Sequence, residues 1–407
     1  MKKFLRYAAW IAVVVAIAGS IVAFSERKLL SRYITHSGDP LTVPQSWFDP
    51  VEVVKGNKRD NILPEKLQAS IIPENIVDEV TAYAEGQGSQ GLIVMHNEAI
   101  QVEEYWGGAN RETLFNPQSM SKTVLAMLLG VAIEEGHIES VDDPIGIYIE
   151  EWGQDNRGSS TIRQALWMSL GLEQMSTSYD INLRNRGVWY NFGDDFDGMI
   201  LDLEQVTPAG SEYEYNNEET NLLGIVIERA TGQRYANYLS EKLWRPLELA
   251  DALMYLDREE GSVMKSCCIF SRPYDWAKLG QLIINRGVHN GKQIVPATWI
   301  DEMLQPSPNV GWYGYQIWLG SDYITQDRIR LKESNDYRVS SERYLVDDMV
   351  VFVGHGEQRV WISPSQNLVI VRATKKWASS WVETKIPNSI LQVLIQQDVA
   401  IAIDGAP

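Results

Sequence analysis

Hydrophobic residues along this chain follow two spacings, and the change from one to the other marks its predicted elements. Alternating or β-rich runs near both ends predict strands over residues 91–96, 100–106, 349–353, 358–362 and 368–372. Helical spacing lies outside these strands, over residues 75–85 and about 387–400. The two ends of the chain therefore supply strands and the helices that flank them.

Helical patterns dominate the middle of the chain, from about residue 138 to 290. They predict helices over residues 160–170, 218–230, 235–243 and 274–286. Gly232 and Gly287 follow two of these segments, as is typical of a helix C-terminus. Strands at both ends around a helical middle predict an α+β fold, in which an antiparallel sheet flanked by helices carries a mainly helical subdomain. We expect the functional cleft between these two parts.

An apolar run from Ala8 to Phe24 follows three basic residues at the N-terminus. A helix over this run measures roughly 26 Å, which nearly crosses a bilayer core of about 30 Å. A retained transmembrane helix is favoured over a cleaved signal peptide, because no convincing small-residue cleavage site follows the run. The predicted organisation is a membrane anchor over residues 1–25, a linker over 26–70 and a catalytic domain over 71–402.

Composition places the chain among globular proteins and narrows its partners. The 407 residues are 44% hydrophobic and 22% charged, with a formal net charge of -18 and no basic cluster. Nucleic acid is not an expected partner, because phosphate binding needs clustered lysine and arginine. The five histidines lack zinc-ligand spacing, so we predict no metal and no cofactor. Cys267 and Cys268 are adjacent, and only a strained vicinal disulfide can join them.

Ser119 and Lys122 begin an apolar helical pattern and share one face of its first turn. Such a lysine can take the serine proton if a dry site lowers the lysine pKa, and the helix N-terminus favours the alkoxide. The same Ser-x-x-Lys spacing recurs at Ser25 and Ser262, but neither opens a long amphipathic helix. Ser119 is therefore the predicted nucleophile. The alternative is a serine and a lysine on a solvated first turn.

Tyr215 and Asn217 lie two apart in a loop that leads into a predicted helix. A phenol beside a lysine ammonium can have its pKa lowered enough to act as a base, and the amide can orient the lysine or the substrate. Tyr235 and Asn237 repeat the spacing inside a predicted helix, where their side chains point apart. The alternative for Tyr215 is an ordinary aromatic residue in a helix-capping loop.

A glycine-containing connection from Gly354 to Gln358 joins two predicted strands. A strand edge here can present the Gln358 N–H beside that of Ser119 as an oxyanion hole, or the segment is a plain hairpin connection. Tyr190 lies in a loop rich in aspartate. It can line the substrate side of the helical part, unless that loop is plain surface.

Taken in this order, the three motifs resemble those of the serine β-lactamase-related family. This family includes class C β-lactamases, low-molecular-weight penicillin-binding proteins, related esterases and 6-aminohexanoate-dimer hydrolases. The similarity spans about residues 75–400 and looks closest to the last group. The segments that carry this likeness are Ser119-Met120-Ser121-Lys122, Ser271-Arg272-Pro273-Tyr274-Asp275-Trp276 and Gly354-His355-Gly356 through Trp361.

The resemblance implies an acyl-enzyme mechanism without metal. Ser119 would be the nucleophile, and Lys122 and Tyr215 would handle its proton. Asn217 would be an orienting amide, and the N–H groups of Ser119 and Gln358 would form the oxyanion hole. By contrast, a serine α/β-hydrolase is disfavoured, because the chain has no Gly-x-Ser-x-Gly elbow.

The third motif departs from the family pattern. His355 and Gly356 stand where β-lactamases have the lysine and threonine that hold a β-lactam carboxylate, and Glu357 replaces the final glycine. The departure disfavours a strong β-lactamase. A carboxylate beside the cleft favours neutral or ammonium-bearing substrates, unless Arg359 neutralises it. We expect Asn217, His355, Gly356, Glu357 and Tyr190 to contact substrate.

These observations predict a metal-independent serine hydrolase that cleaves an amide or ester bond of a small molecule. A D,D-peptidase-like or β-lactam-reactive envelope enzyme is one alternative, and a catalytically silent penicillin-binding-like module is another. The predicted location is the cell inner membrane, with the catalytic domain in the periplasm. A secreted or periplasmic form after signal cleavage is the alternative, and the sequence leaves the oligomeric state open.

Overall fold

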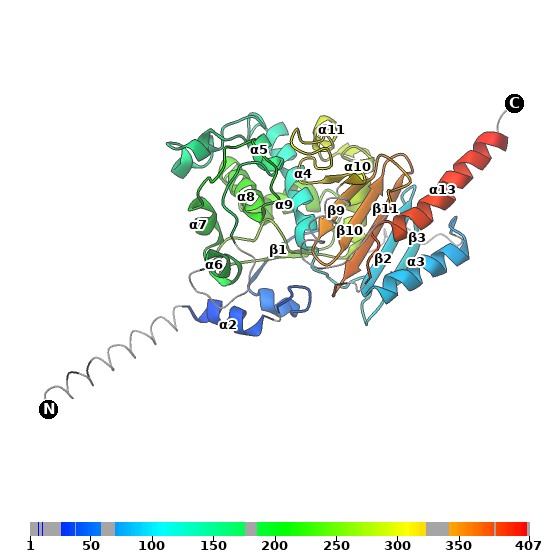
Figure 1. The fold of residues 1–407 in the computed structure, drawn as a ribbon, viewed down its shortest axis with the longest axis horizontal. Helices are drawn as coiled ribbons and strands as arrows, with labels where there is room; N and C mark the ends of the chain where they lie inside the picture. Colours follow the sequence, from blue (N-terminus) through cyan, green and yellow to red (C-terminus); the bar gives the residue numbers. More distant parts are fainter. Residues whose placement is uncertain are drawn as a thin grey trace.

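One antiparallel sheet organises the molecule, and strands from both ends of the chain build it. The computed structural model describes residues 7, 10, 26–36, 38–57, 70–175, 185–322, 342–377 and 380–404. The sheet has the order β3-β2-β11-β10-β9-β8 (Figure 1). Its strands are β2 (Ser89–His96), β3 (Ala99–Tyr105), β8 (Trp318–Leu319), β9 (Val350–Gly354), β10 (Gln358–Ser363) and β11 (Leu368–Thr374). Ile93 of β2 pairs with Val371 of β11, so early and late strands meet inside the sheet.

The two faces of the sheet pack into two hydrophobic cores, because side chains alternate along each strand. Ile370 and Val371 are neighbours on β11, and they belong to opposite cores. One core lies under the two terminal helices of the domain, and the other lies under two helices from the middle of the chain (Figure 1). These helices are α3 (Glu74–Gly86) and α13 (Lys385–Asp404) on the first face, and α4 (Ser121–Glu134) and α10 (Pro273–Ile284) on the second.

A mainly helical part lies beside the sheet, as predicted, and α8 is its central helix (Figure 1). The Asn216 side chain caps α8 by accepting from two backbone N–H groups, and Gly232 ends it with a φ of 66°. The helix predicted over residues 160–170 is shorter than expected. The helices here are α5 (Ile162–Leu166), α6 (Arg186–Phe192), α7 (Phe196–Leu201), α8 (Asn217–Thr231), α9 (Tyr235–Leu239) and α11 (Ala297–Met303).

Several short elements complete the described chain. The hairpin β6 (Val288–His289) and β7 (Lys292–Gln293) stands apart from the main sheet. Short 3₁₀ turns are η1 (Gln45–Phe48), η2 (Gln118–Met120), η3 (Ile145–Ile147), η4 (Glu150–Trp152) and η5 (Asn156–Ser159), and η6 (Ser240–Trp244) is a π turn. Of these, η2 matters most for the site because it carries Ser119.

The described parts of the segment predicted as a linker, residues 26–36 and 38–57, pack on the domain. Within it, β1 (Val51–Val54) pairs with β4 (Ala252–Tyr255), and β5 (Ile269–Phe270) completes this second sheet. Arg32 of α2 (Arg27–Thr35) is buried and donates to the carbonyls of residues 49, 193, 256 and 257. These contacts were not predictable from the segment itself, because they join residues far apart in sequence and leave no local pattern.

The apolar run predicted as a membrane anchor lies outside the described residues, apart from Trp10. Among the helices that the structure describes, none is long and apolar enough to cross a membrane.

Candidate active site

Ser119 lies on a strained turn at the start of α4. It occupies the middle of η2, and Ser121 begins the α-helix. Gln118, directly before it, has a φ of 54°, a left-handed conformation that non-glycine residues rarely adopt and that clusters at functional sites. The end of β9 packs against this turn so closely that a Cβ on Gly354 would lie 2.2 Å from the Pro117 carbonyl oxygen. The partly exposed Ser119 is therefore held between a helix start and a strand end.

Lys122 is buried one turn after Ser119, and its side chain points toward Tyr215 and Asn217. Its side chain donates to the Asn217 Oδ1 atom at 2.7 Å and to the Ser266 carbonyl at 3.1 Å. Its Nζ atom lies 5.3 Å from the centre of the Tyr215 ring. The structure thus brings together Lys122, Tyr215 and Asn217, which are distant in sequence.

The surroundings of Lys122 suit it to accept a proton. Desolvation by burial lowers its pKa to about 7, although the nearby Glu218 carboxylate raises that pKa in part. A large fraction of such a lysine is neutral at neutral pH, so it can act as a base. The first turn of α8 orients the Lys122 side chain through Asn217 and also supplies Glu218.

The second lysine of a Ser-x-x-Lys motif has the opposite environment. Lys265 is fully buried between Asp197 at 2.8 Å and Glu228 at 3.0 Å. Burial alone would lower the pKa of Lys265, but the two carboxylates raise it above its ordinary value. Lys265 therefore stays charged and is a structural cation. The third such serine, Ser25, lies outside the described residues.

Tyr215 stands among aromatic side chains, while its rival Tyr235 lies in the core. The Tyr215 ring is 5.7 Å from that of Trp318 and 6.5 Å from that of Tyr313. Trp312 stacks on Trp318 at 5.5 Å and extends this surface. Tyr235 is completely buried on α9, and its hydroxyl has no hydrogen-bond partner within the described part of the chain.

Gln358 lies close to the turn that carries Ser119. It begins β10, which has β9 on one side and β11 on the other, and its side chain bonds both backbone groups of Thr374. Both β9 and β10 contact η2, and Gln358 pairs with Gly354 at the end of β9. The role of the Gln358 N–H as an oxyanion donor stays a prediction.

Two other residues of the third motif contact residues 39 and 41, within the segment predicted as a linker. The exposed His355 ring packs against Trp377 and lies 3.6 Å from Asp39. Gly356 lies against Leu41, whose Cδ1 atom would be 2.0 Å from a Cβ at this glycine. Their predicted contact with substrate has no support in these interactions, because sequence patterns do not show which distant segment covers a turn.

Glu357 does not present an open carboxylate to the cleft. The residue is only 3% exposed and has a φ of 59°, which explains why glycine is usual in this place. The buried Arg372 donates to its carbonyl at 2.7 Å and also interacts electrostatically with Glu357. Arg359, the predicted counter-charge, instead pairs with Glu383 at 2.8 Å.

Tyr190 is a core residue and not part of a substrate-lining loop. It lies on α6, is 3% exposed, and its hydroxyl bonds Asn221. Burial raises its pKa well above the usual range. The prediction of a loop here was wrong, because the aspartates that suggested it follow α6 and surround α7. Contact of Tyr190 with substrate stays a prediction. Sequence reasoning also missed Glu218 and Ser266, since neither belongs to a spaced motif.

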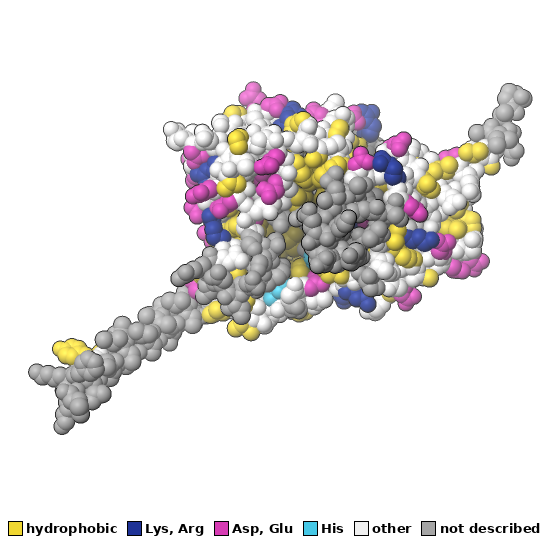
Figure 2. Space-filling model, in the orientation of Figure 1, with side chains coloured by type: hydrophobic (Ala, Val, Ile, Leu, Met, Phe, Trp, Pro, Cys, Tyr) yellow, Lys and Arg dark blue, Asp and Glu magenta, His cyan; other side chains and the backbone are white. Residues whose placement is uncertain are grey.

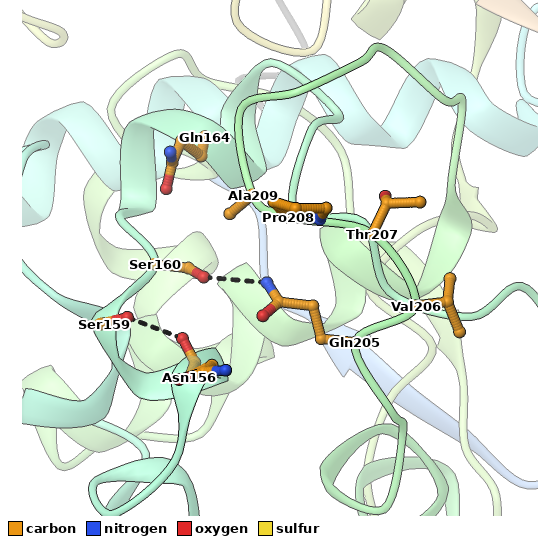
Figure 3. Close-up of a pocket in the computed structure, with 9 residues that line it drawn as sticks. All are labelled: Asn156, Ser159, Ser160, Gln164, Gln205, Val206, Thr207, Pro208 and Ala209. Atoms are coloured by element: carbon orange, nitrogen blue, oxygen red, sulfur yellow. Dashed lines mark hydrogen bonds between the residues drawn. The ribbon is translucent and has the colours of Figure 1, made fainter.

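An open pocket of about 470 Å³ lies in the helical part, away from these residues. Gln205 donates to Ser160 across it, and Ser159 bonds the backbone of Asn156 (Figure 3). None of the site residues predicted above lines it, and its lining is uncharged: Asn156, Ser159, Ser160, Gln164, Gln205, Val206, Thr207, Pro208 and Ala209. In the described part of the chain, no three potential metal ligands are grouped.

Comparison with known proteins decides the family. A model of the beta-lactamase family matches residues 77–394, most of the chain. The chain belongs to the beta-lactamase family. The resemblance found in the motifs is thereby confirmed, and the α+β fold is that of this family. Figure 2 shows hydrophobic side chains gathered in the hollow between the helical part and the sheet.

Relatives within the beta-lactamase family include hydrolases. The chain is 23% identical to 6-aminohexanoate-dimer hydrolase of Paenarthrobacter ureafaciens over 53% of its own length and 57% of that protein. A Bacillus anthracis protein provisionally described as such a hydrolase has 20% identity and a TM-score of 0.67, over 92% and 97% of the two chains. EstCE1, a hydrolase with promiscuous acyltransferase activity, has 14% identity and a TM-score of 0.58, over 79% and 97%.

Proposed function

We propose that the protein is a metal-independent serine hydrolase that cleaves an amide or ester bond through an acyl-Ser119 intermediate. The observation that carries this proposal is the environment of Lys122. This lysine is buried, has a pKa of about 7, and is held by Asn217 beside the Tyr215 ring. A lysine with a purely structural role would be expected to form ion pairs, as Lys265 does. Lys122 instead donates to a neutral amide and to a backbone carbonyl.

In the proposed reaction, neutral Lys122 takes the Ser119 proton while the Ser119 oxygen attacks the substrate carbonyl. The Lys122 ammonium then returns this proton through the Tyr215 hydroxyl to the leaving amine or alcohol. The N–H groups of Ser119 and Gln358 stabilise the oxyanion. Water, activated by the same pair, releases the acyl group and restores Ser119.

The substrate proposed is a neutral or ammonium-bearing amide or ester with an apolar part. Support comes from the aromatic side chains next to Tyr215, which include Trp318, Trp312 and Tyr313. A family relative acts on 6-aminohexanoate dimer by its name, which combines an amide with an aliphatic chain. Glu357 contributes less to this proposal than the sequence suggested, because Arg372 lies beside it.

The apolar run ahead of α2 supports a second part of the proposal, an inner-membrane anchor with the catalytic domain in the periplasm. Membrane fractionation with N-terminal sequencing tests it. Recovery with membranes and an intact N-terminus is expected, and a soluble form beginning near Gly19 or Phe24 would show a cleaved signal peptide.

Covalent labelling with a fluorophosphonate probe tests the catalytic proposal. The adduct should map to Ser119, and Ser119→Ala should abolish it while Ser262→Ala retains it. The wild type and Ser262→Ala should hydrolyse a p-nitrophenyl ester, and Ser119→Ala should not. Absence of both labelling and hydrolysis in the folded protein would favour a silent penicillin-binding-like module. Stable acylation by a β-lactam would favour the D,D-peptidase-like alternative.

A further inference from the structure

Cys267 and Cys268 form a disulfide between neighbouring residues, in the segment that contacts the catalytic lysine. Ser266 comes directly before the disulfide, and its carbonyl accepts from Lys122. Ile269 comes directly after it, and its N–H donates to the Ser121 side chain at 3.2 Å. The disulfide thus lies between two contacts with the first turn of α4.

The same segment is also bound to α8. The Asn221 side chain accepts from the Ser266 N–H at 3.1 Å and donates to the Ser266 hydroxyl at 2.9 Å. Asn221 and Ser266 are both buried. These bonds place Ser266 between the helix that carries Lys122 and the helix that begins with Asn217, so its carbonyl has little room to move while they persist.

The disulfide restrains the backbone next to this carbonyl. It closes a small ring that contains the peptide bond between the two cysteines, and Cys268 has a φ of 72° in the left-handed region. That conformation is unfavourable for a non-glycine residue, and the closed ring limits the escape from it. When the ring opens, Cys268 can return to an ordinary conformation, and the peptide groups on both sides must rotate.

We propose that this disulfide is a redox-sensitive control of the active site: when it is closed it holds the Ser266 carbonyl on Lys122, and its reduction releases that carbonyl and slows acylation of Ser119. The inference rests on the proposed function, because it assigns a regulatory role to a group that touches the proposed base. Ser266 and the two cysteines are positioning residues and do not contact the reacting atoms.

The chemistry is a thiol–disulfide exchange with a dithiol as the reductant. Cys267 is partly exposed and Cys268 is 3% exposed, so the reductant thiolate attacks the Cys267 sulfur. The bond between the cysteines breaks, and Cys268 leaves as a thiolate that takes a proton. The second thiol of the reductant then displaces Cys267 as a thiol, and the reductant becomes a cyclic disulfide.

Loss of the Ser266 contact changes both the position and the titration of Lys122. The groups that face Lys122 are the Asn217 amide, the Ser266 carbonyl, the Tyr215 ring and the Glu218 carboxylate. A carbonyl acceptor stabilises the ammonium form, so its departure lowers the Lys122 pKa further. The reduced enzyme should be slower because Lys122 is displaced and is a weaker base, and the acid limb of its pH profile should lie at lower pH because the Lys122 pKa is lower.

The experiment compares the oxidised chain with the chain treated with dithiothreitol. Alkylation and mass spectrometry report the state of Cys267 and Cys268, and a thermal melt reports whether the fold persists. Fluorophosphonate labelling of Ser119 is then timed from about pH 5 to pH 9. We expect labelling to be about 10-fold slower at pH 7 after reduction and to recover after reoxidation. This loss is smaller than the roughly 100- to 10,000-fold expected when a general base is removed, because Lys122 is displaced and not lost.

The double variant Cys267→Ser/Cys268→Ser is the matched control. It should label as slowly as the reduced wild type and should not respond to dithiothreitol. Equal rates for the oxidised and reduced wild type would overturn the inference, and so would a double variant with wild-type rate and pH profile. A response of the double variant to dithiothreitol would also count against it.

One further readout separates this inference from the proposed function. Competitive acetylation with acetic anhydride measures the pKa and reactivity of Lys122 without any turnover. A difference between the oxidised and reduced chains supports the contact between the disulfide segment and Lys122 even if Ser119 never labels. Identical values in both states overturn the inference even if Ser119 proves to be the nucleophile.

Discussion

At the scale of single residues, the site depends on a lysine without a carboxylate in direct contact. Lys122 has an amide and a carbonyl as acceptors, whereas Lys265, with the same sequence spacing from a serine, has two carboxylates. Burial therefore lowers one lysine pKa and the carboxylates raise the other. Spacing alone could not separate them, because the decisive partners lie more than 30 residues away in the sequence, as Asp197 does from Lys265.

Tyr215 and Lys122 should behave as one unit in catalysis. Tyr215→Phe keeps the ring and removes the hydroxyl, and loss of a general base costs roughly 100- to 10,000-fold in rate. Because both residues serve the same proton transfer, the double variant with Lys122→Ala should be little slower than either single variant. Hydrolysis of a p-nitrophenyl ester measures this. Tyr235→Phe is the control and should remain active. Mild, additive losses would contradict the coupling.

Glu218 should set the pH dependence of the reaction. Its carboxylate raises the pKa of Lys122, so Glu218→Gln should lower that pKa and move the acid limb of kcat/KM to lower pH. Gln can still accept from the Met175 N–H, which Glu218 bonds at 3.0 Å. In the wild type, activity should fall as pH drops below about 7, because Lys122 becomes charged. An unchanged acid limb in the variant would exclude this role.

Glu219→Gln is the matched control for that shift. Glu219 follows Glu218 on α8 and is equally buried, but it bonds the Leu170 N–H and is not among the groups that perturb Lys122. The acid limb of the kcat/KM profile of Glu219→Gln should match that of the wild type.

At the scale of elements, strong periodicity was predictable and isolated contacts were not. The helix expected over residues 218–230 is α8. The strands expected over residues 91–96 and 100–106 are β2 and β3, and Asn97 and Glu98 join them with positive φ at both residues. Both signals are local. The position of Gln358 inside the sheet depended on the strand order, which places β10 between β9 and β11. No pattern within β10 itself reveals its neighbours.

The start of α8 should connect helix stability with activity. The buried Asn216 accepts from the Glu218 and Glu219 N–H groups and donates to the Leu172 carbonyl. Asn216→Ala should lower the free energy of unfolding by about 1–2 kcal/mol in urea denaturation. It should also slow hydrolysis, because the next residue, Asn217, holds Lys122.

Asp195→Ala is the comparison for Asn216→Ala. The exposed Asp195 side chain caps α7 by accepting from the Gly198 N–H, and it has no contact with Lys122 among the described interactions. Asp195→Ala should reduce stability by a similar or smaller amount without a change in rate. A loss of activity as large as that of Asn216→Ala would mean that stability alone explains both.

At the scale of the whole molecule, α2 and β1, within residues 26–57, pack as part of the domain. Removal of residues 1–25 should leave the melting temperature nearly unchanged, whereas removal of residues 1–57 should lower it strongly, because β1 and Arg32 are lost. Arg32→Met should lower the free energy of unfolding by at least about 2 kcal/mol, since it leaves buried carbonyls without their charged donor. Arg27→Met, on the exposed side of α2, is the control and should be near neutral.

Strand order also has a consequence for the way this protein is made. Strands β2 and β3 emerge early from the ribosome, yet β2 needs β11 as its second neighbour, with Ile93 against Val371. At translation rates of about 5–20 residues per second, the β2 edge of the nascent β2–β3 hairpin waits roughly 15–60 s before β11 can pair with it. During that interval it is a target for aggregation or for a holding chaperone, and the chain cannot complete its sheet until synthesis is nearly finished.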